Sequence, residues 1–329
     1  MSYRISPVWW PIIGLSSPLL APMLLIRNRR FRKHCSQTGE VNRDRIAHAQ
    51  MLPLPELDFL DLLPLVEFKT EPDFLGAAGV SYLFTTSRGS LLFDVGYGPE
   101  DPSLVQNAQK VGFSIDQADA LVISHLHPDH MGGIKAYRQK RIHLPPELGA
   151  PRALRCFLPD KAHCPHGSTE IVQKPQMLTA GIASTGPLAR SLFIMGWTEE
   201  QALVARLKGK GLVIFTGCGH PTIEIIIDMA KRLSSEPIYA IGGGLHFPVT
   251  DSPLHKGGLK VQMILGTGKP PWQKISAEDL SRTIATINDV NPRHVFLSAH
   301  DTCDHALSRF ADELNSEVSI LRAGAKYRL

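Results

Sequence analysis

The chain of 329 residues is 43% hydrophobic and 20% charged, which is typical of a globular protein and excludes a disordered one. Its net charge of +4 arises in the first 33 residues, which hold six Lys and Arg side chains and no acid. The rest of the chain is slightly acidic, which excludes a basic nucleic-acid-binding surface over the fold. The five scattered cysteines do not form a disulfide framework and indicate a reducing compartment or a metal ligand among them.

The first predicted element is an uncharged stretch over residues 5–26, which is as long as the ~20 residues that cross a bilayer. Trp9 and Trp10 suit the headgroup level of a membrane, and a basic cluster follows over residues 27–33. A secretory signal carries its basic residues before the apolar run, so this order opposes export. We therefore expect residues 1–33 to associate with a membrane.

Three arrangements of this segment are open from the sequence. A straight transmembrane helix would keep the basic cluster in the cytoplasm. A re-entrant segment, bent near Ser17 and Pro18, would leave Arg4 and Arg27 on the cytoplasmic side, and the prolines at positions 7, 11, 18 and 22 favour this bent form. An apolar arm packed on the protein's own core is the third arrangement. Both membrane arrangements place the main domain at the cytoplasmic face of a membrane.

Residues 34–75 are predicted to form a connector, and residues 76–329 a catalytic domain. In this domain an early hairpin is followed by strands that alternate with helices, which is typical of sheets covered by helices with active residues on loops. Strands are expected at 80–86, 90–96, 120–124, 211–217, 237–243, 294–300 and 317–324, and helices are expected to begin at Ser103, Thr222 and Ser276. Two long stretches without a regular pattern, 139–190 and 247–275, are interpreted as binding loops or lids.

The residues SHLHPDHMGG at positions 124–133 place four metal-ligating side chains within six positions, directly after a predicted strand. These side chains are His125, His127, Asp129 and His130. A histidine-rich surface turn is the alternative, but a solvated loop does not need this density of ligand-type residues. Imidazole and carboxylate ligands suit Zn²⁺, iron or Mn²⁺, and zinc is the usual metal of nitrogen-rich sites.

Later strand ends supply further candidate ligands. His220 follows a predicted strand and opens a helix, whose free N–H groups can also hold an anion. His300 ends a late strand and is a third candidate position for metal binding. His246 follows a glycine run that permits close approach of a ligand, and we expect it to act on the substrate more than on the metal. Cys218 is as consistent with a small buried cysteine as with a metal ligand.

The pattern H-x-H-x-D-H at residues 125–130 resembles the metal-binding signature of the metallo-β-lactamase superfamily, and Asp94 matches an earlier strand-end aspartate of that superfamily. The later motifs FTGCGHPTIEII, IGGGLHF and LSAHDTCDH resemble a narrower branch. That branch includes the enzyme that joins a dihydropterin-methyl diphosphate to ribofuranosylaminobenzene 5'-phosphate. The resemblance covers roughly residues 75–329 and implies an α/β fold, a four-layer αββα sandwich, with two divalent metal ions.

The resemblance implies a ligand set of His125, His127 and His220 for the first metal ion and Asp129, His130 and His300 for the second. A metal-bound hydroxide would attack an ester or phosphoester, with Asp129 orienting it and His246 acting on the substrate. We therefore expect a membrane-associated metal-dependent hydrolase, most simply a zinc enzyme, that acts on a small amphipathic or phosphorylated substrate. A transferase with a diphosphate-activated, pterin-like substrate and a non-catalytic metal or redox sensor are the alternatives.

Overall fold

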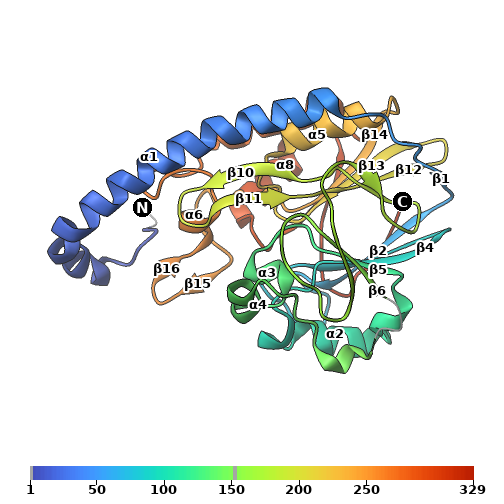
Figure 1. The fold of residues 1–329 in the computed structure, drawn as a ribbon, viewed down its shortest axis with the longest axis horizontal. Coiled ribbons are helices and arrows are strands. Elements are labelled where there is room, and N and C mark those ends of the chain that lie inside the picture. Colours follow the sequence, from blue (N-terminus) through green and yellow to red (C-terminus); the bar gives the residue numbers. More distant parts are fainter. Residues whose placement is uncertain (1–2, 151–153) are drawn as a thin grey trace.

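Two β-sheets form the centre of the computed structural model, which describes residues 3–150 and 154–329 (Figure 1). The first sheet runs in the order β19 (Tyr327–Arg328), β2 (Leu60–Val66), β3 (Ser81–Thr86), β4 (Gly89–Phe93), β5 (Ala120–Val122), β6 (Leu154–Leu158) and β7 (Gly167–Ile171). The second runs in the order β18 (Glu317–Ile320), β17 (His294–Leu297), β14 (Ile238–Gly243), β13 (Gly211–Thr216), β12 (Leu203–Leu207), β9 (Ala183–Ser184) and β8 (Gln176–Met177), with β1 (Glu56–Leu57) paired to β12.

Two small hairpins and a set of helices surround the sheets. The hairpins are β10 (Leu188–Leu192) with β11 (Gly196–Glu200), and β15 (His255–Lys256) with β16 (Leu259–Lys260). The α-helices are α1 (Trp10–His48), α2 (Ser103–Val111), α3 (Pro128–Met131), α4 (Ile134–Gln139), α5 (Ile223–Leu233), α6 (Gln262–Leu265), α7 (Ala277–Val290) and α8 (Asp304–Glu313). Short 3-10 turns are η1 (Pro7–Trp9), η2 (Gly98–Glu100), η3 (Ile115–Gln117) and η4 (Pro146–Leu148).

The two sheets stack face to face with apolar side chains between them. Phe84 of β3 contacts Phe215 of β13, with ring centroids 4.9 Å apart. Helices α2 and α4 cover the outer face of the first sheet, and α5, α7 and α8 cover the outer face of the second. The result is a four-layer arrangement, with one hydrophobic core between the sheets and one beneath each helix layer.

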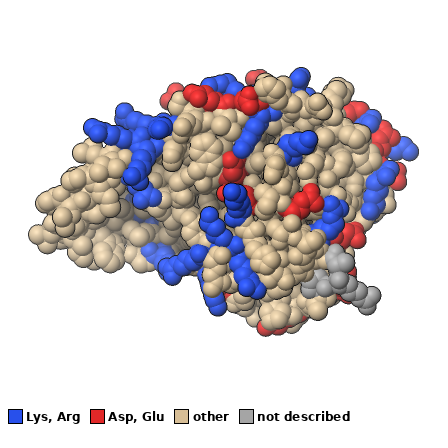
Figure 2. All heavy atoms as spheres, in the orientation of Figure 1, with Lys and Arg blue, Asp and Glu red and all other residues tan. Residues whose placement is uncertain are grey.

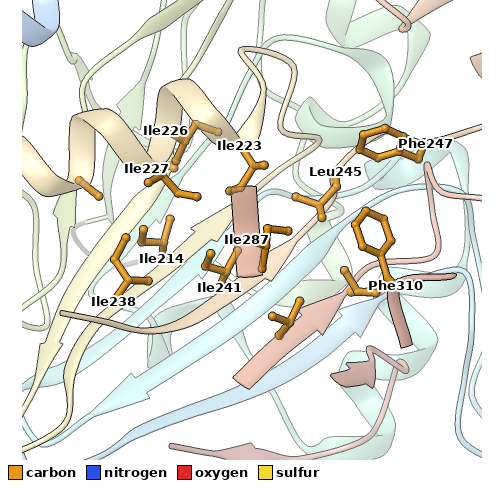
Figure 3. Close-up of a cluster of buried hydrophobic side chains, with 14 of the residues drawn as sticks. Ile214, Ile223, Ile226, Ile227, Ile238, Ile241, Leu245, Phe247, Ile287 and Phe310 are labelled. Atoms are coloured by element: carbon orange, nitrogen blue, oxygen red, sulfur yellow. The ribbon is translucent and has the colours of Figure 1, made fainter. Parts of the chain in front are cut away.

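The sequence explains the outer core of the second sheet. Every residue of β13 is buried, as expected for a strand covered on both faces. Helix α5 buries one stripe of side chains at helical spacing, namely Ile223, Ile226, Ile227, Ala230 and Leu233. These side chains pack with Ile214, Ile241 and Ile287 (Figure 3). Each large aliphatic side chain buried in this way stabilises the fold by about 1.5–3 kcal/mol.

Most predicted elements of the catalytic domain are confirmed. β3 and β4 form the expected hairpin, and β5, β13, β14, β17 and β18 lie within the predicted ranges. Helix α7 begins after Ser276, whose hydroxyl accepts a hydrogen bond from the backbone N–H of Asp279 at 3.2 Å. The carboxylate of Asp279 accepts the Ser276 N–H in return at 2.7 Å, which completes a capping box.

The stretches without a pattern contain more regular structure than the sequence indicated. Residues 139–190 supply β6 to β9, which are strands of two to five residues. Strands this short give little hydrophobic periodicity, so only their pairing with neighbouring strands identifies them. Residues 34–75, interpreted as a connector, continue α1 to His48 and then supply β2 inside the first sheet. Cys156 of β6 is joined to Cys164 by a disulfide, which the cysteine count did not predict.

The N-terminal segment differs from the expected bent form. Helix α1 is continuous from Trp10 to His48 and runs through its interior prolines, Pro18 and Pro22. Pro11 lies in the first turn, where a missing N–H breaks no helical bond. Pro18 and Pro22 are four residues apart and lie on one side of the helix. The backbone hydrogen bonds that they remove are therefore on that side, and those on the other side remain.

Candidate metal centre

Loops at the carboxyl ends of strands in both sheets meet at one edge of the sandwich. The loop after β5 carries His125 and His127, and the following α3 carries Asp129 and His130. Cys218 and His220 follow β13, His246 follows β14, and His300 follows β17. Because β13, β14 and β17 are parallel neighbours, their carboxyl ends lie at the same edge. The structure thus brings all the sequence-predicted site residues together.

Eight side chains form overlapping groups in which the ligand atoms lie within 4.8 Å of one another. The groups are His125, His127 and His220; Asp129, His130, Cys218 and His300; and Cys218, His220 and His246. The first two groups contain the two predicted ligand sets. Cys218, left open by the sequence, joins the second set, and His246 lies close enough to offer a ligand atom as well.

Several ring nitrogens in this cluster have no protein partner. His125 Nε2, His220 Nδ1 and His246 Nδ1 are buried and have no hydrogen-bond partner among residues 3–150 and 154–329. Buried polar atoms without partners are rare in folded proteins, because each costs free energy comparable to a lost hydrogen bond. An imidazole nitrogen that lacks a hydrogen-bond partner is free to bind a metal, so these residues fit a divalent cation.

Cys218 lies between two of the histidines. Its Sγ is 3.1 Å from His130 Nε2 and 3.2 Å from His300 Nε2. Burial raises the pKa of the Cys218 thiol well above its usual range, and the carboxylates of Asp301 and Asp129 raise it further. A thiolate at this position therefore needs a cation beside it, which is the condition under which cysteine ligates metals.

Burial also keeps most of the imidazoles neutral, which is the form that binds metals. Burial first, and neighbouring rings second, lower the pKa of His127 to about 3 and those of His125, His220 and His300 well below the usual range. Burial likewise lowers the pKa of His246 to about 4. For His130, burial opposes the charged form, but Asp129 and Asp94 outweigh it and raise the pKa to about 9.

Asp94, after β4, orients the histidine motif from behind. Its carboxylate accepts hydrogen bonds from the backbone N–H and the hydroxyl of Ser124, both at 2.6 Å, and lies 2.7 Å from His130 Nδ1. The Ser124 hydroxyl is also 2.9 Å from His125 Nδ1. These bonds fix the rings so that the opposite nitrogens face the cluster. Asp94 has φ of 62°, a left-handed conformation that these bonds hold in place.

Glu200, at the end of β11, is a site residue that sequence reasoning missed. Its buried carboxylate accepts four backbone N–H bonds, from Gly217, Cys218, Gly219 and His220, at 2.7 to 3.1 Å. The carboxylate thereby holds the loop that presents Cys218 and His220. In the sequence Glu200 is one of two adjacent glutamates, and only the crossing of β11 over this loop distinguishes it from a surface residue.

Glu67, after β2, is the second residue that was missed, and it supports His300. It accepts hydrogen bonds from the hydroxyls of Tyr82 at 2.7 Å and Ser298 at 2.5 Å, and from the backbone N–H groups of Phe68 and Ala299. The Ser298 hydroxyl lies 2.5 Å from the Nδ1 atom of the His300 ring. Burial raises the pKa of Glu67 to about 7, although these donors oppose the shift.

This raised pKa gives a testable dependence of stability on pH. Because the pKa of Glu67 is higher in the folded state, its contribution to stability is full below pH 4.5 and is lost as the pH rises through 7. The amide of Glu67→Gln can donate to both hydroxyls while its oxygen accepts both N–H bonds. We therefore expect the wild type to lose about 3 kcal/mol relative to this variant between pH 4.5 and 8.

Urea unfolding of metal-free wild type and variant at pH 4.5 and pH 8 measures this difference. A shared offset at both pH values would show only that the amide fits less well than the carboxyl group. Equal changes of the unfolding free energy with pH in the two proteins would contradict the expectation, because Glu67 would then titrate alike in the folded and unfolded chains.

The cluster opens into a cavity of about 600 Å³ that a substrate can enter. Its lining includes five of the clustered residues, His127, Asp129, Cys218, His220 and His246. The side chain of Asp129 is 18% exposed there, whereas those of His130 and His300 are fully buried behind it. Residues 254–266 of the long stretch after β14, predicted to be a binding loop or lid, form one wall of this cavity.

The comparisons with known proteins agree with this geometry. A family model described as Metallo-beta-lactamase superfamily matches residues 76–145, which include the histidine motif. The solved structure of Tm1679, titled a metal-dependent hydrolase of the beta-lactamase superfamily, is 19% identical, with a TM-score of 0.57, covering 82% of this chain and 98% of that one. YhfI from Bacillus subtilis, a metallo-beta-lactamase fold protein, is 14% identical, with a TM-score of 0.50 and coverage of 83% and 100%. No curated protein sequence matches this chain.

Proposed function

Because this chain has the metallo-β-lactamase fold and its residues 76–145 match the superfamily's model, we propose that it is a metal-dependent hydrolase of an ester or phosphoester. The observation that carries the proposal is the cluster of eight ligand side chains with unpartnered ring nitrogens beside an open cavity. The structural neighbour titled a metal-dependent hydrolase supports the same reaction class.

Two divalent cations, with zinc as the first choice, are proposed for this site. The residues that would hold the first cation are His125, His127 and His220, and those for the second are Asp129, His130, Cys218 and His300. When bound, such cations polarise the group under attack and make water acidic enough to attack it at neutral pH. The nitrogen-rich first set and the mixed second set are both within the ligand chemistry of zinc.

The chain's own residues orient the reactants. Asp129 projects into the cavity, and burial raises its pKa, so its carboxylate is suited to orient a water molecule and to accept a proton from it. His246 also lines the cavity, and its Nδ1 has no hydrogen-bond partner among the described residues, although the Asp301 carboxylate lies 3.8 Å away. We assign His246 to contact with the substrate, while its place beside Cys218 and His220 also permits a metal bond.

A second candidate function is transfer of a diphosphate-activated group. The motif FTGCGH, which resembles the pterin-linked branch, forms the loop of Cys218 and His220. Three cationic side chains, Arg190, Lys269 and Arg282, line a neighbouring hollow in which a diphosphate could be held. The ligand set is compatible with both reactions, so the products distinguish them.

The test is metal analysis of the purified protein together with a panel of chromogenic carboxylic esters, phosphomonoesters, phosphodiesters and diphosphates. A hydrolase releases alcohol or phenol from one ester class, and removal of the metal by a chelator abolishes the activity. Diphosphate release that requires an added acceptor would support the transferase. A full metal site without turnover of any class would overturn both functions and leave a metal or redox sensor.

We propose that the amino-terminal part of α1 holds the enzyme at the cytoplasmic face of a membrane. Residues Pro7–His48 are long and apolar enough to cross a bilayer. Val8, Leu15 and Leu19 are 78%, 85% and 83% exposed, so the apolar run is not packed on the protein's own core. Figure 2 shows an uncharged protruding end, which Figure 1 identifies as this part of α1, with Lys and Arg gathered where the helix reaches the body.

Contacts at both ends of the apolar run favour a helix lying in the membrane surface over one that spans it. Near the start of the run, Trp9 Nε1 donates to the Gly257 carbonyl at 2.8 Å, in the turn of the β15–β16 hairpin. After it, Arg27 Nε donates to the Phe193 carbonyl at 2.7 Å, next to β10. Both ends therefore touch the same domain, whereas a spanning helix would carry its first residues across the bilayer. The basic cluster after Arg27 suits an anionic cytoplasmic leaflet.

The double variant Leu15→Asp/Leu19→Asp is expected to release the protein from membranes. Both side chains are exposed, so the fold should be unaffected, while each substitution removes a leucine whose burial among acyl chains is worth about 1.5–3 kcal/mol. The measurement is cell fractionation, followed by flotation with anionic vesicles. Ser36→Asp/Gln37→Asp, which adds the same charge on the exposed polar half of α1, is the control and should remain bound. A wild-type protein that is soluble without lipid or detergent would contradict the proposal.

A further inference from the structure

Two hollows of different chemistry meet at the metal centre. One is the cavity of about 600 Å³ described above, and the other, of about 350 Å³, shares part of its lining. Both are lined by His220, His246 and Gly266, so the two hollows adjoin beside the cluster. We call them the apolar hollow and the cationic hollow, for the side chains described next.

Arg190 of β10 is the distinctive side chain of the cationic hollow. Its guanidinium has no hydrogen bond or ion pair with any residue in the part of the chain that the structure describes, although the side chain is partly buried. Its Nε and Nη2 atoms lie 2.5 and 2.6 Å from where a side chain on Gly268 would begin, so the glycine makes room for it. Burial lowers the pKa of Arg190, although Cys35, Glu224 and Asp279 oppose this shift.

The other two cations of this hollow are already paired within it. Lys269 forms an ion pair with Asp279, which Arg282 also approaches at 4.0 Å. Glu224 accepts a hydrogen bond from the Thr283 hydroxyl at 2.7 Å. Arg190 is therefore the cation of this lining, among the described residues, that forms no direct ion pair, although Glu224 and Asp279 lie near enough to act on its charge.

The amino terminus of α5 adds donors to the same hollow. Its N-cap, Thr222, makes no side-chain capping bond, and Thr222, Ile223 and Glu224 all line the hollow. The first N–H groups of a helix have no partner inside the helix, and the positive end of its dipole favours anions. Arg190 and this helix end therefore converge on a space in which an anionic group would satisfy both.

Most of the exposed lining of the apolar hollow is apolar, although Glu100, Asp101, Arg138 and Lys256 also border it. Its lining away from the cluster includes Tyr97, Ile134, Tyr137, Met195, Leu254 and Leu265. Part of that wall comes from residues 254–266, which include the β15–β16 hairpin and α6. The hairpin bonds to the start of the N-terminal segment, since the Ser6 N–H donates to the Gly258 carbonyl at 2.9 Å. The apolar hollow thus lies next to the segment proposed to enter the membrane.

We propose that the substrate is an amphipathic ester whose anionic group binds Arg190 and the α5 amino terminus and whose hydrocarbon part fills the apolar hollow. The bond to be hydrolysed then lies at the metal centre, between the two hollows. This proposal rests on the proposed hydrolase function and deepens it by naming the substrate class. It makes Arg190 a specificity-determining residue and Leu265 part of the hydrocarbon site.

The test is calorimetric binding to the metal-loaded, full-length protein of octyl phosphate below its micelle concentration, octanol and inorganic phosphate. We expect octyl phosphate to bind at least 10-fold more tightly than either fragment, because it alone occupies both hollows. Arg190→Met should weaken the binding of octyl phosphate and of inorganic phosphate at least 10-fold, which is the loss of affinity expected for one charge-assisted contact. Arg190→Lys should restore part of this affinity. It replaces Arg190→Met in the test if the methionine variant does not fold.

Two further variants separate the hollows from a general effect of charge. Leu265→Gln should weaken the binding of octyl phosphate and leave the binding of inorganic phosphate unchanged. Arg155→Met removes an exposed arginine of β6, paired with Glu170, and should change neither. Equal binding of octyl phosphate by wild type and Arg190→Met would overturn the proposal even if the enzyme hydrolyses esters. Binding as expected without hydrolysis of any ester would overturn the proposed reaction instead and leave the binding site.

Tight binding of inorganic phosphate, with no gain in affinity from the octyl chain, would also overturn the proposal. The ligand would then be free phosphate and not an amphipathic molecule. If Leu265→Gln binds octyl phosphate as tightly as the wild type does, the octyl chain lies outside the apolar hollow. That result would overturn the hydrocarbon half of the assignment.

Discussion

His220→Ala is expected to lose its metal and to hydrolyse the best substrate more than 100-fold more slowly than the wild type. His220 belongs to both the group of His125 and His127 and the group of Cys218 and His246, so its removal breaks two donor groups at once. Loss of an outer hydrogen-bond partner of a metal ligand costs about 10–100-fold, and loss of a ligand costs more. The measurements are metal content after gel filtration and initial rates at matched protein concentration.

His305→Ala is the matched control, because His305 is exposed, lies on α8 and belongs to none of the groups that the structure describes. It should keep full metal and full activity. The Nε2 atom of His220 lies 3.2 Å from His127 Nδ1, which is the hydrogen-bond contact of this ring among the described residues. Removal of the ring should therefore leave the fold intact, and circular dichroism can check this. Full metal content in His220→Ala would remove His220 from the ligand set.

Glu200→Ala is expected to destabilise the metal-free protein by about 4 kcal/mol or more. Its carboxylate accepts four buried backbone N–H groups, and each buried donor left without a partner costs about 1–3 kcal/mol. The loop that presents Cys218 and His220 would lose its main support, so metal affinity should fall with stability. Chemical denaturation of the metal-free protein measures the first effect, and titration with Zn²⁺ measures the second.

Glu200→Gln tests the geometry of this support. One carboxylate oxygen accepts from Gly217, Cys218 and Gly219, and the other accepts only from His220. A glutamine with its oxygen in the first position keeps three of the four bonds, so we expect a loss well below that of alanine. Equal losses in the two variants would mean that the negative charge, and not the number of accepted bonds, holds the loop.

The local spacing of ligand-type residues was enough to predict the first half of the candidate metal centre. His125, His127, Asp129 and His130 fall within six positions after a strand, and no tertiary information is needed to see that they lie together. His220 and His300 could be selected because each follows a strongly apolar strand, and strand ends are where such sites collect. The hydrophobic cores around these residues could also be predicted, because fully buried strands are apolar throughout.

Other features depended on contacts between segments far apart in the chain. Glu67 and Glu200 are ordinary glutamates in the sequence, and their roles arise because β2 and β11 bring them beneath loops more than a dozen residues away. Arg190 likewise acquires its place only when β10 packs beside the loop of Gly268. Hydrophobic periodicity carries no information about such pairings, because it reports which face of a segment is buried and not what covers it.

What the sequence by itself determined was the metal-binding motif, the alternating strands and helices of the domain, and the apolar, basic-flanked amino terminus. Each is encoded by residues close together in the chain, through ligand spacing, burial period or charge order. Only the tertiary structure decided that Cys218 joins the ligand cluster, that α1 continues through Pro18 and Pro22, and that both ends of the apolar run touch one domain. These depend on the packing of distant segments, whose free energy no single stretch of sequence contains.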